Sequence, residues 1–348
     1  MRRTSWVLTG TAVVLVAASA VTRFTVYPAL HQVPADTRST FRYEGTATLL
    51  DATALGAGDM DKAFLRDVPV VLDRRIEVRD VDGRTAVVSD DVALRGRDGT
   101  EMSTSEHTWA VDRRDLTERA APAGSGAERH EGLVISWPLE PAKRDYRFWD
   151  TGTRTVSPAR FKGTESVRGR EAYVYDIESS GPLADPAVAS SLPRTLPREA
   201  VLGLVSALPA EQRPNQEALA SLPKVVPLSY TSTTERRGWV DADTGLSLNG
   251  TLRQTVLART QGADGPVALF PVTDVDVRGT DASVRQQADD ATTTGRLLWL
   301  LGIGGPLGLL FVALLLVALA LVLSRRRARP DTGTEEAGTD TQTTTTPA

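Results

Sequence analysis

The sequence predicts a mainly β protein of the α+β class, in which an antiparallel β-rich extracytoplasmic domain with a helical insertion is flanked by two transmembrane helices. Three observations support this prediction. A long uncharged segment lies near each end, apolar–polar alternation with hairpin turns fills most of the middle, and one proline-bounded stretch has helical periodicity. Turn signals this frequent, without alternating long helices, argue against a doubly wound parallel sheet.

The composition restricts the chemistry available to the chain. Its 348 residues include no cysteine and only three histidines, and its formal net charge is −4. Thiol catalysis, disulfide bonds and cysteine-ligated metals are therefore excluded. Nucleic acid binding requires a basic surface, so a nucleic acid partner is not expected.

The N-terminal segment is predicted to be a membrane anchor. Arg2 and Arg3 precede an uncharged stretch that covers residues 4–22, so residues 1–3 would lie in the cytoplasm. A cleaved signal peptide is the alternative, because Ala18-Ser19-Ala20 has the small-residue spacing of a cleavage site. The anchor is favoured, since the apolar core of a signal peptide is typically only about 7–15 residues long.

The second predicted transmembrane helix covers residues 297–323, which carry no charge. About 20 apolar residues are enough to cross the hydrocarbon core of a membrane. Four arginines follow, and by the positive-inside rule they place the C-terminus in the cytoplasm: Arg325, Arg326, Arg327 and Arg329. The sequence thus predicts a two-pass protein of the cell membrane with both termini cytoplasmic, residues 24–296 outside and residues 324–348 as a disordered cytoplasmic tail.

Alternation with period two predicts the strands of the middle region. Phe41, Tyr43, Ala47 and Leu49 alternate with polar residues, as expected for a strand with one face in water. Turn sequences that separate further strands are Asp82-Gly83, Asp98-Gly99 and the run Asp241-Ala242-Asp243-Thr244-Gly245.

A helical insertion is predicted at residues 183–224, where prolines recur. Pro197 stands where a helix would begin, and the apolar side chains that follow have helical spacing: Val201, Leu204, Val205 and Leu208. A shorter helix is expected at residues 215–222. This apolar stripe can pack on the sheet or form an exposed face for a lipid or a partner, and packing is favoured because most such stripes face a core.

No catalytic or metal-binding motif stands out in the sequence. A nucleophile elbow, a phosphate-binding loop, a zinc-binding His-Glu-x-x-His motif and a dinucleotide-binding glycine pattern are all missing. His107 shares a predicted strand face with Trp109 and Val111, which indicates packing at the edge of a core. No catalytic residue, cofactor or metal is therefore predicted, and a non-enzymatic role is expected.

Aromatic residues gather in one part of the chain. Four of its 19 aromatic side chains fall within one short segment, namely Trp137, Tyr146, Phe148 and Trp149, and Arg144 and Arg147 lie among them. These six residues form a candidate ligand site, in which the rings contact an acyl chain or a sugar and the arginines pair with an anionic headgroup. The alternative is a plug of the hydrophobic core, because aromatic side chains usually dominate cores.

A series of short motifs runs along the chain in a recognisable order. They are Tyr27-Pro28-Ala29-Leu30, Val33-Pro34-Ala35-Asp36, Tyr43-Glu44-Gly45-Thr46-Ala47, Ser136-Trp137-Pro138, Tyr146, Trp149-Asp150, Gly163-Thr164-Glu165, Gly169, Val240-Asp241 and Thr244-Gly245. In these motifs the chain resembles an uncharacterised actinobacterial two-span membrane protein family that carries a domain of unknown function and is often labelled the porin PorA family. The resemblance implies a retained N-terminal anchor, and the family label implies pore formation. Two spans without polar faces cannot enclose an aqueous channel in one chain.

Three functions remain open from the sequence. The first is a protein that binds or transfers an envelope lipid or lipoglycan, with a topology similar to that of class B scavenger receptors, whose two-anchor ectodomains carry an apolar tunnel. The second is a structural or regulatory partner of an envelope-assembly complex. The third is an envelope hydrolase that acts through carboxylates.

Overall fold

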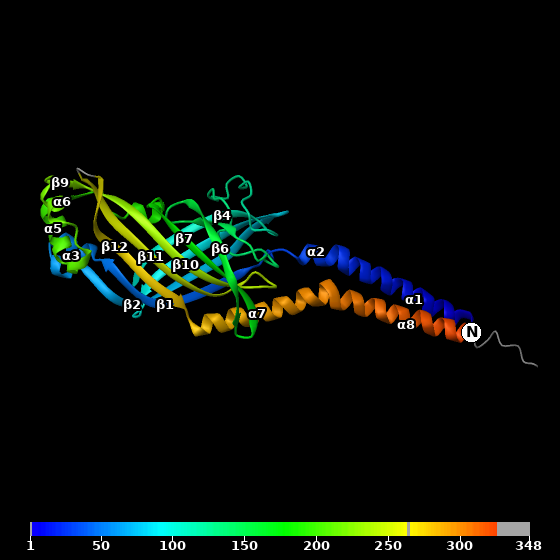
Figure 1. Ribbon diagram of the computed structural model, residues 1–348. Helices are drawn as coiled ribbons and strands as arrows, with labels where there is room; N and C mark the ends of the chain where they lie inside the picture. The colour runs from blue at the N-terminus through cyan, green and yellow to red at the C-terminus, as the bar shows by residue number, and fades with distance from the viewer. Residues whose placement is uncertain (1, 263–264, 326–348) are drawn as a thin grey trace, which may run out of the picture. The chain divides into compact units, whose positions relative to one another are not determined.

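The computed structural model describes residues 2–262 and 265–325. The chain divides into two compact units, one made of Met1–Pro28 with Trp299–Ala348 and the other of Ala29–Leu298. The first unit is helical, and the second contains the large sheet (Figure 1).

The helical unit contains the apolar segments expected from the sequence. The N-terminal segment forms α1 (Arg2–Val21), the π-helical turn η1 (Thr22–Val26) and α2 (Tyr27–Leu30), and the C-terminal segment forms η4 (Leu300–Gly304) and α8 (Gly305–Arg325). Two helices are long and apolar enough to cross a membrane, Trp6–Leu30 and Asp281–Ser324. The predicted pair of apolar helices is therefore confirmed, and their exposed Leu, Val and Phe side chains suit contact with lipid.

Small residues line the contact between α1 and α8. Ala12, Ser19, Ala313 and Ala320 are buried there. The Ser19 hydroxyl donates a hydrogen bond of 2.9 Å to the carbonyl oxygen of Pro306. Small side chains let membrane helices approach closely, and a hydroxyl bonded across the contact satisfies a group that lipid cannot.

The β-rich unit is built on one antiparallel sheet of ten strands, in the order β4-β3-β2-β1-β12-β11-β10-β7-β6-β5. The sheet confirms the predicted fold class. Its strands are β1 (Arg38–Leu50), β2 (Phe64–Asp82), β3 (Thr85–Gly96), β4 (Glu101–Asp112), β5 (Tyr146–Asp150), β6 (Thr155–Val167), β7 (Arg170–Pro182), β10 (Ser229–Asp241), β11 (Ser247–Gly262) and β12 (Gly265–Gly279).

The first and last strands of the sheet pair with each other at its centre. Strands β1 and β12 are antiparallel, with Tyr43 opposite Gly279 and Leu49 opposite Thr273. This pairing joins two arms, β1–β4 on one side and β5, β6, β7 and β10–β12 on the other. The arms are continuous in sequence, so each one is largely a meander of neighbouring strands.

The sheet curls until its two arms share one core. Val88 and Trp109 from the first arm pack in the same cluster as Phe148, Tyr175 and Val240 from the second. We call these residues and the buried side chains packed with them the first core cluster. The segment that links β4 to β5 contacts both edge strands, because bridges join Trp109 to Glu128 and Leu133 to Phe148. The linking residues 128–133, which we call the seam segment, therefore connect the two edges of the curled sheet.

The predicted turns occur as hairpins. Gly83 lies between β2 and β3, Gly99 between β3 and β4, and Gly245 between β10 and β11. All three have positive φ, at 55°, 89° and 69°. Glycine adopts this conformation without the penalty that a side chain imposes, which explains the turn sequences.

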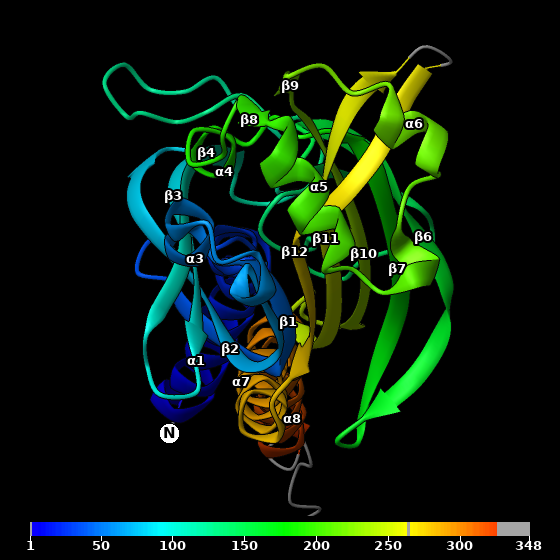
Figure 2. The same cartoon turned by 90° about the vertical axis from the view of Figure 1, so that its left-hand side faces the viewer.

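The segment that links β7 to β10 in the sequence forms short helices, which cover one end of the sheet. This segment contains α4 (Pro186–Ala189), α5 (Arg198–Ser206), η3 (Ala210–Gln212) and α6 (Gln216–Ala220), together with a small sheet of β8 (Thr195–Pro197) and β9 (Val225–Pro227) (Figure 2). The apolar stripe of α5 packs inward, since Val201, Leu204, Val205 and Leu208 are buried. With Phe270 and others from the sheet they form the second core cluster.

Within the described part of the β-rich unit, three helical segments were not expected from the sequence pattern. They are α3 (Ala52–Ala57), the 3-10 turn η2 (Met60–Lys62) and α7 (Asp281–Trp299). Helix α7 begins well before Leu297, where the sequence predicted the end of the β-rich domain. It buries Val284, Ala288 and Ala291 against the β-rich unit, so its first part is a packed helix of this unit. Three consecutive threonines and the pair Asp289-Asp290 mask its helical period.

Candidate functional site

Polar side chains form a belt on the inward face of the curled sheet, to which every strand except β1 and β12 contributes. On β10, the inward-facing residues run from Tyr230 in the second core cluster, through Thr234 and Arg236, to Val240 in the first. The polar belt consists of Arg74, Asp90, His107, Asp150, Ser157, Ser179, Thr234, Arg236 and Gln254, which come from eight of the ten strands.

One ion pair in the belt is complete. The Arg74 guanidinium donates two hydrogen bonds to Asp90, from Nε to Oδ1 at 2.8 Å and from Nη2 to Oδ2 at 2.7 Å, and a third to the carbonyl oxygen of Val134 at 2.9 Å. Burial lowers the pKa of Arg74, but the charge and hydrogen bonds of Asp90 outweigh it and the pKa is raised. Arg74 is therefore a fixed cation with a bidentate partner.

Arg236 lies near this pair, but no carboxylate contacts it directly. Among the described residues it makes no hydrogen bond or ion pair, and its Nε atom is buried. Its guanidinium lies over the ring of Phe148, 5.8 Å from the centroid. Burial lowers the pKa of Arg236, the charge of Asp150 opposes this shift, and the charge of Arg74 adds to it.

His107 is the third cation of the belt, and two carboxylates hold it. Its Nδ1 lies 2.9 Å from Glu128 Oε1, and its Nε2 lies 3.5 Å from Asp185 Oδ2. The ring also stacks on Trp109, with 5.2 Å between centroids. Burial lowers the pKa of His107, but the hydrogen bonds to Asp185 and Glu128 outweigh it and raise the pKa to about 9. His107 is thus protonated at neutral pH.

A serine next to His107 completes an arrangement that resembles a catalytic triad. Ser105 Oγ lies 3.0 Å from His107 Nε2 and also donates to Asp185 Oδ2 at 3.3 Å. A general base must be neutral to accept a proton from serine. Because His107 carries a proton at neutral pH, this trio is better suited to holding Asp185, the N-cap of α4, and Glu128 of the seam segment against β4.

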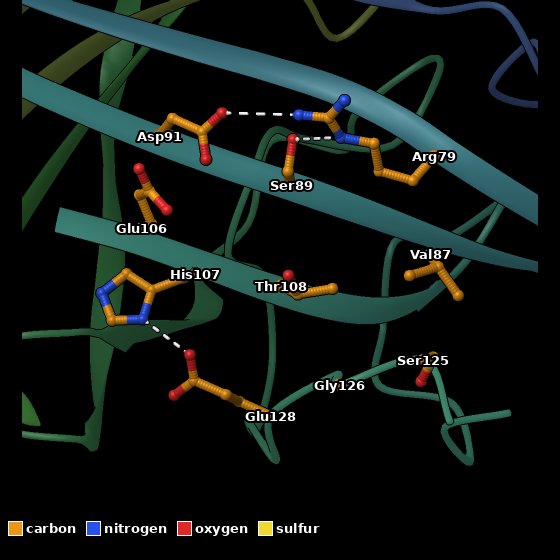
Figure 3. A pocket seen from close by; sticks show the side chains of 10 residues that line it. All are labelled: Arg79, Val87, Ser89, Asp91, Glu106, His107, Thr108, Ser125, Gly126 and Glu128. Atoms are coloured by element: carbon orange, nitrogen blue, oxygen red, sulfur yellow. Dashed lines mark hydrogen bonds and ion pairs between the residues drawn. The ribbon is translucent and has the colours of Figure 1, made fainter. Parts of the chain in front are cut away.

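A polar cleft of about 390 Å³ opens beside His107 (Figure 3). It is lined by side chains from the outer faces of β2, β3 and β4, among them Arg79, Asp91 and Glu106, and by Glu128 of the seam segment. Arg79 contacts Ser89 at 3.1 Å and Asp91 at 3.8 Å across its wall. A second cleft, of about 360 Å³, lies on the outer face of β6, β7 and β10.

The predicted aromatic cluster is divided between the core and the surface. Trp137 and Phe148 are buried in the first core cluster, and Trp137 stacks on Tyr175 with 5.3 Å between ring centroids. Tyr146 and Trp149 are partly buried against the same cluster. The rings thus come together, and Phe148 also contacts Arg236 of the belt. Whether the cluster binds a ligand stays a prediction.

The two predicted arginine partners of these rings lie at the surface. Arg144 is exposed over the ring of Tyr146, 5.2 Å from its centroid, and Arg147 is exposed and pairs with Glu131. They do not join Trp137 and Phe148 inside. Of the arginines predicted to orient the chain, Arg2 and Arg3 begin α1, Arg325 ends α8, and Arg326, Arg327 and Arg329 lie outside the described residues.

Sequence reasoning missed the roles of Arg236 and His107. The β10 sequence is polar on both faces from Thr231 to Arg237, and this missing alternation is the sequence signal of a polar interior. The partners of His107 come from residues 128 and 185, which are distant in sequence, so no spacing rule could have found them. Among the described residues, no group of three or more His, Asp or Glu side chains is placed to hold a metal ion.

Comparisons with known proteins identify the family. No curated protein matches the chain. A crystal structure from Lactobacillus plantarum assigned as an oleoyl thioesterase is 13% identical and covers 78% of this chain and 86% of its own, but its TM-score of 0.14 is too low to carry an argument. The family model described as Porin PorA matches residues 4–322. The match includes both apolar helices and the whole sheet, and the chain belongs to the Porin PorA family.

Proposed function

We propose that this chain is a membrane-anchored, non-enzymatic protein whose extracytoplasmic domain binds or transfers an envelope lipid or lipoglycan. The observation that supports this proposal most is the inward face of the sheet, where the polar belt lies between two apolar core clusters. A lipid has the same division, with a polar headgroup and apolar chains. Such a face offers both kinds of contact at once.

Several inward-facing side chains near the belt are not fully covered by protein. Tyr43, Val92, Leu252 and Gln254 remain partly accessible. The first three pack against a further cluster of buried apolar residues on β1, β2, β3 and β12. Arg74 likewise keeps 20% of its side chain accessible. This partial accessibility supports a ligand within the curl, next to the belt.

An apolar helix at each end of the β-rich domain would hold it close to a membrane. Its first strand follows one apolar helix, and its last strand precedes the other. A domain held at both ends cannot diffuse away from the bilayer that supplies its ligand. Both the two apolar helices and the family are compatible with a membrane-associated protein.

The family name refers to a porin, but pore formation is the weaker candidate. The two apolar helices expose Leu, Val and Phe, which do not line a water-filled channel. The outer faces of the strands carry charges such as Arg42, Glu44 and Arg75. A membrane-spanning barrel instead presents an apolar band to lipid.

Lipid bound to the purified full-length chain tests the proposal. The chain is extracted from membranes in a maltoside detergent and its lipid content is measured by mass spectrometry. Leu252→Trp should reduce bound lipid at least tenfold, because the larger ring fills the inward side next to the belt. Arg253→Trp, on the outer face of the same strand, is the matched control and should retain lipid. Absence of lipid from the unmodified chain would reject lipid binding and favour a structural partner role.

Three of the six residues of the candidate ligand site are tested separately. Truncating a buried Trp typically costs about 3–5 kcal/mol, so Trp137→Ala should lower the melting temperature sharply if this ring serves only the core. A ring that contacts ligand would instead leave the apo fold intact and lose lipid. Trp149→Ala and Arg144→Ala, measured in the same way, decide whether the surface part of the cluster takes part.

A further inference from the structure

Arg236 is a cation without a carboxylate partner among the residues that the structure describes. It faces into the curled sheet from β10, its Nε atom is buried, and it makes no hydrogen bond or ion pair among the residues that the structure describes. A guanidinium carries five N–H donors, and an unsatisfied buried donor is costly. The contact with the Phe148 ring offsets only part of that cost.

The neighbouring carboxylates are already engaged. Asp90 is held by the bidentate contact with Arg74. Asp150 accepts hydrogen bonds from the backbone and the hydroxyl of Thr153, both at 2.8 Å. Asp150 acts on Arg236 through its charge, but the two do not form an ion pair among the described residues. The donors of Arg236 thus remain available.

A second unused donor lies on the same inward face. Tyr43 projects from β1, and its hydroxyl makes no hydrogen bond among the described residues. A Cβ atom at Gly250 of β11 would lie 3.2 Å from the Tyr43 hydroxyl, and Leu252, two residues along β11, is paired with Arg236. On its other side Tyr43 is paired with Leu72 of β2, two residues from Arg74, so the three groups share one region of the inward face. Burial raises the pKa of Tyr43, and the neutral hydroxyl can donate.

We propose that Arg236 and Tyr43, next to the Arg74–Asp90 pair, form a binding site for a phosphate group inside the curled sheet. Phosphate offers several acceptor oxygens, so one group can accept from a guanidinium and from a hydroxyl together. Its negative charge would balance the cation that the protein leaves unpaired. The headgroup of a phospholipid and free phosphate share this chemistry, and the lipid source rests on the proposed function.

Thermal melts of the full-length chain in maltoside and Tris chloride test the site. Sodium phosphate is compared with sodium chloride at equal ionic strength, and dioctanoyl phosphatidylglycerol with dioctanoylglycerol, which lacks the phosphate. The unmodified chain should be stabilised by one or both phosphate-containing probes and by neither control. Stabilisation by phosphatidylglycerol alone identifies a lipid headgroup as the ligand, and stabilisation by inorganic phosphate identifies a site for the free anion as well.

Three variants separate this site from other effects. Arg236→Met should weaken binding at least tenfold while the apo melting temperature stays equal or rises, because an unpaired buried charge has been removed. Tyr43→Phe should weaken binding several-fold. Arg237→Met is the matched control, since Arg237 faces outward on the same strand and pairs with Asp176 at 2.6 Å, and it should bind normally.

The outcomes distinguish this site from the proposed function. If lipid copurifies equally with the unmodified chain and with Arg236→Met, and phosphate stabilises neither, the phosphate site is wrong while lipid binding stands. If phosphate binds through Arg236 but no lipid copurifies, the site stands and lipid binding is wrong. If Arg237→Met loses binding as fully as Arg236→Met, the effect is one of surface charge and the site is wrong.

Discussion

Arg74, Arg236 and His107 lie on the same inward face, but their charges are balanced in different ways. Arg74 has a bidentate carboxylate and His107 has two carboxylates, whereas Arg236 has an aromatic ring. Desolvated charges need compensation close by. Removing one of these contacts should therefore destabilise the fold more than removing a surface ion pair would.

The ion pairs of His107 predict a pH dependence of stability. The pKa of the ring is raised from an unfolded value of about 6.5 to about 9, so the folded state binds the proton more tightly. The resulting stabilisation is fully present below pH 6.5 and is lost as pH rises through 9, by about 3 kcal/mol in total. Chemical denaturation of the detergent-solubilised chain between pH 6 and pH 9.5 measures it.

Two variants check the assignment of this pH dependence. His107→Gln should be less stable than the unmodified chain at pH 6 and should lose most of the slope between pH 6.5 and 9. Glu106→Gln, on the opposite face of the same strand, should keep the slope. An unchanged slope in His107→Gln would contradict the role given to the ring.

At the scale of single elements, the pairing of β1 with β12 leaves no room for a side chain at position 45. A Cβ atom at this position would collide with the carbonyl oxygen of Asp276 and lie 2.8 Å from the Val277 Cα atom on β12. Gly45→Ala should therefore push β1 and β12 apart and destabilise the domain by about 1–3 kcal/mol. Gly181→Ala is the control, because its nearest neighbour would lie at 3.5 Å. Equal melting temperatures for the two variants would contradict this reading of the pairing.

Helix α1 packs in a way that favours its retention. Ser19, the middle residue of the candidate cleavage motif, is buried against α8 and bonded to Pro306. We expect the intact mass of the membrane-extracted chain to include residues 1–20. A mature chain that begins at Val21 would show that the segment is a cleaved signal peptide.

For the whole molecule, the arginine placement predicts two passes with the β-rich domain outside the cytoplasm. A reporter fused to the C-terminus should read as cytoplasmic, and one inserted near Gly181 should read as external. Reversing the charge of Arg325, Arg326 and Arg327 tests the cause, because the second span should then lose its orientation signal. A cytoplasmic reading at Gly181 in the unmodified chain would reject the topology.

Much of the fold could be predicted from local sequence, and the site could not. The alternation around Phe41 and Tyr43, the Asp-Gly turns and the period of Val201 and Leu204 each depend on residues a few positions apart. The pairing of β1 with β12, the curl and the partners of His107 join residues separated by 20 to more than 200 positions. Such contacts depend on the closing of the whole sheet, which local patterns do not encode.

The central pairing of β1 with β12 has a consequence for biogenesis. Tyr43 pairs with Gly279, so the sheet cannot be completed until nearly the whole β-rich unit has been synthesised. Until then β1 has an open edge, and closing so long a loop is slow. The nascent first arm must stay soluble until then, and charged outer side chains on β1 and β2 are of the kind that keeps such an edge from pairing with another chain.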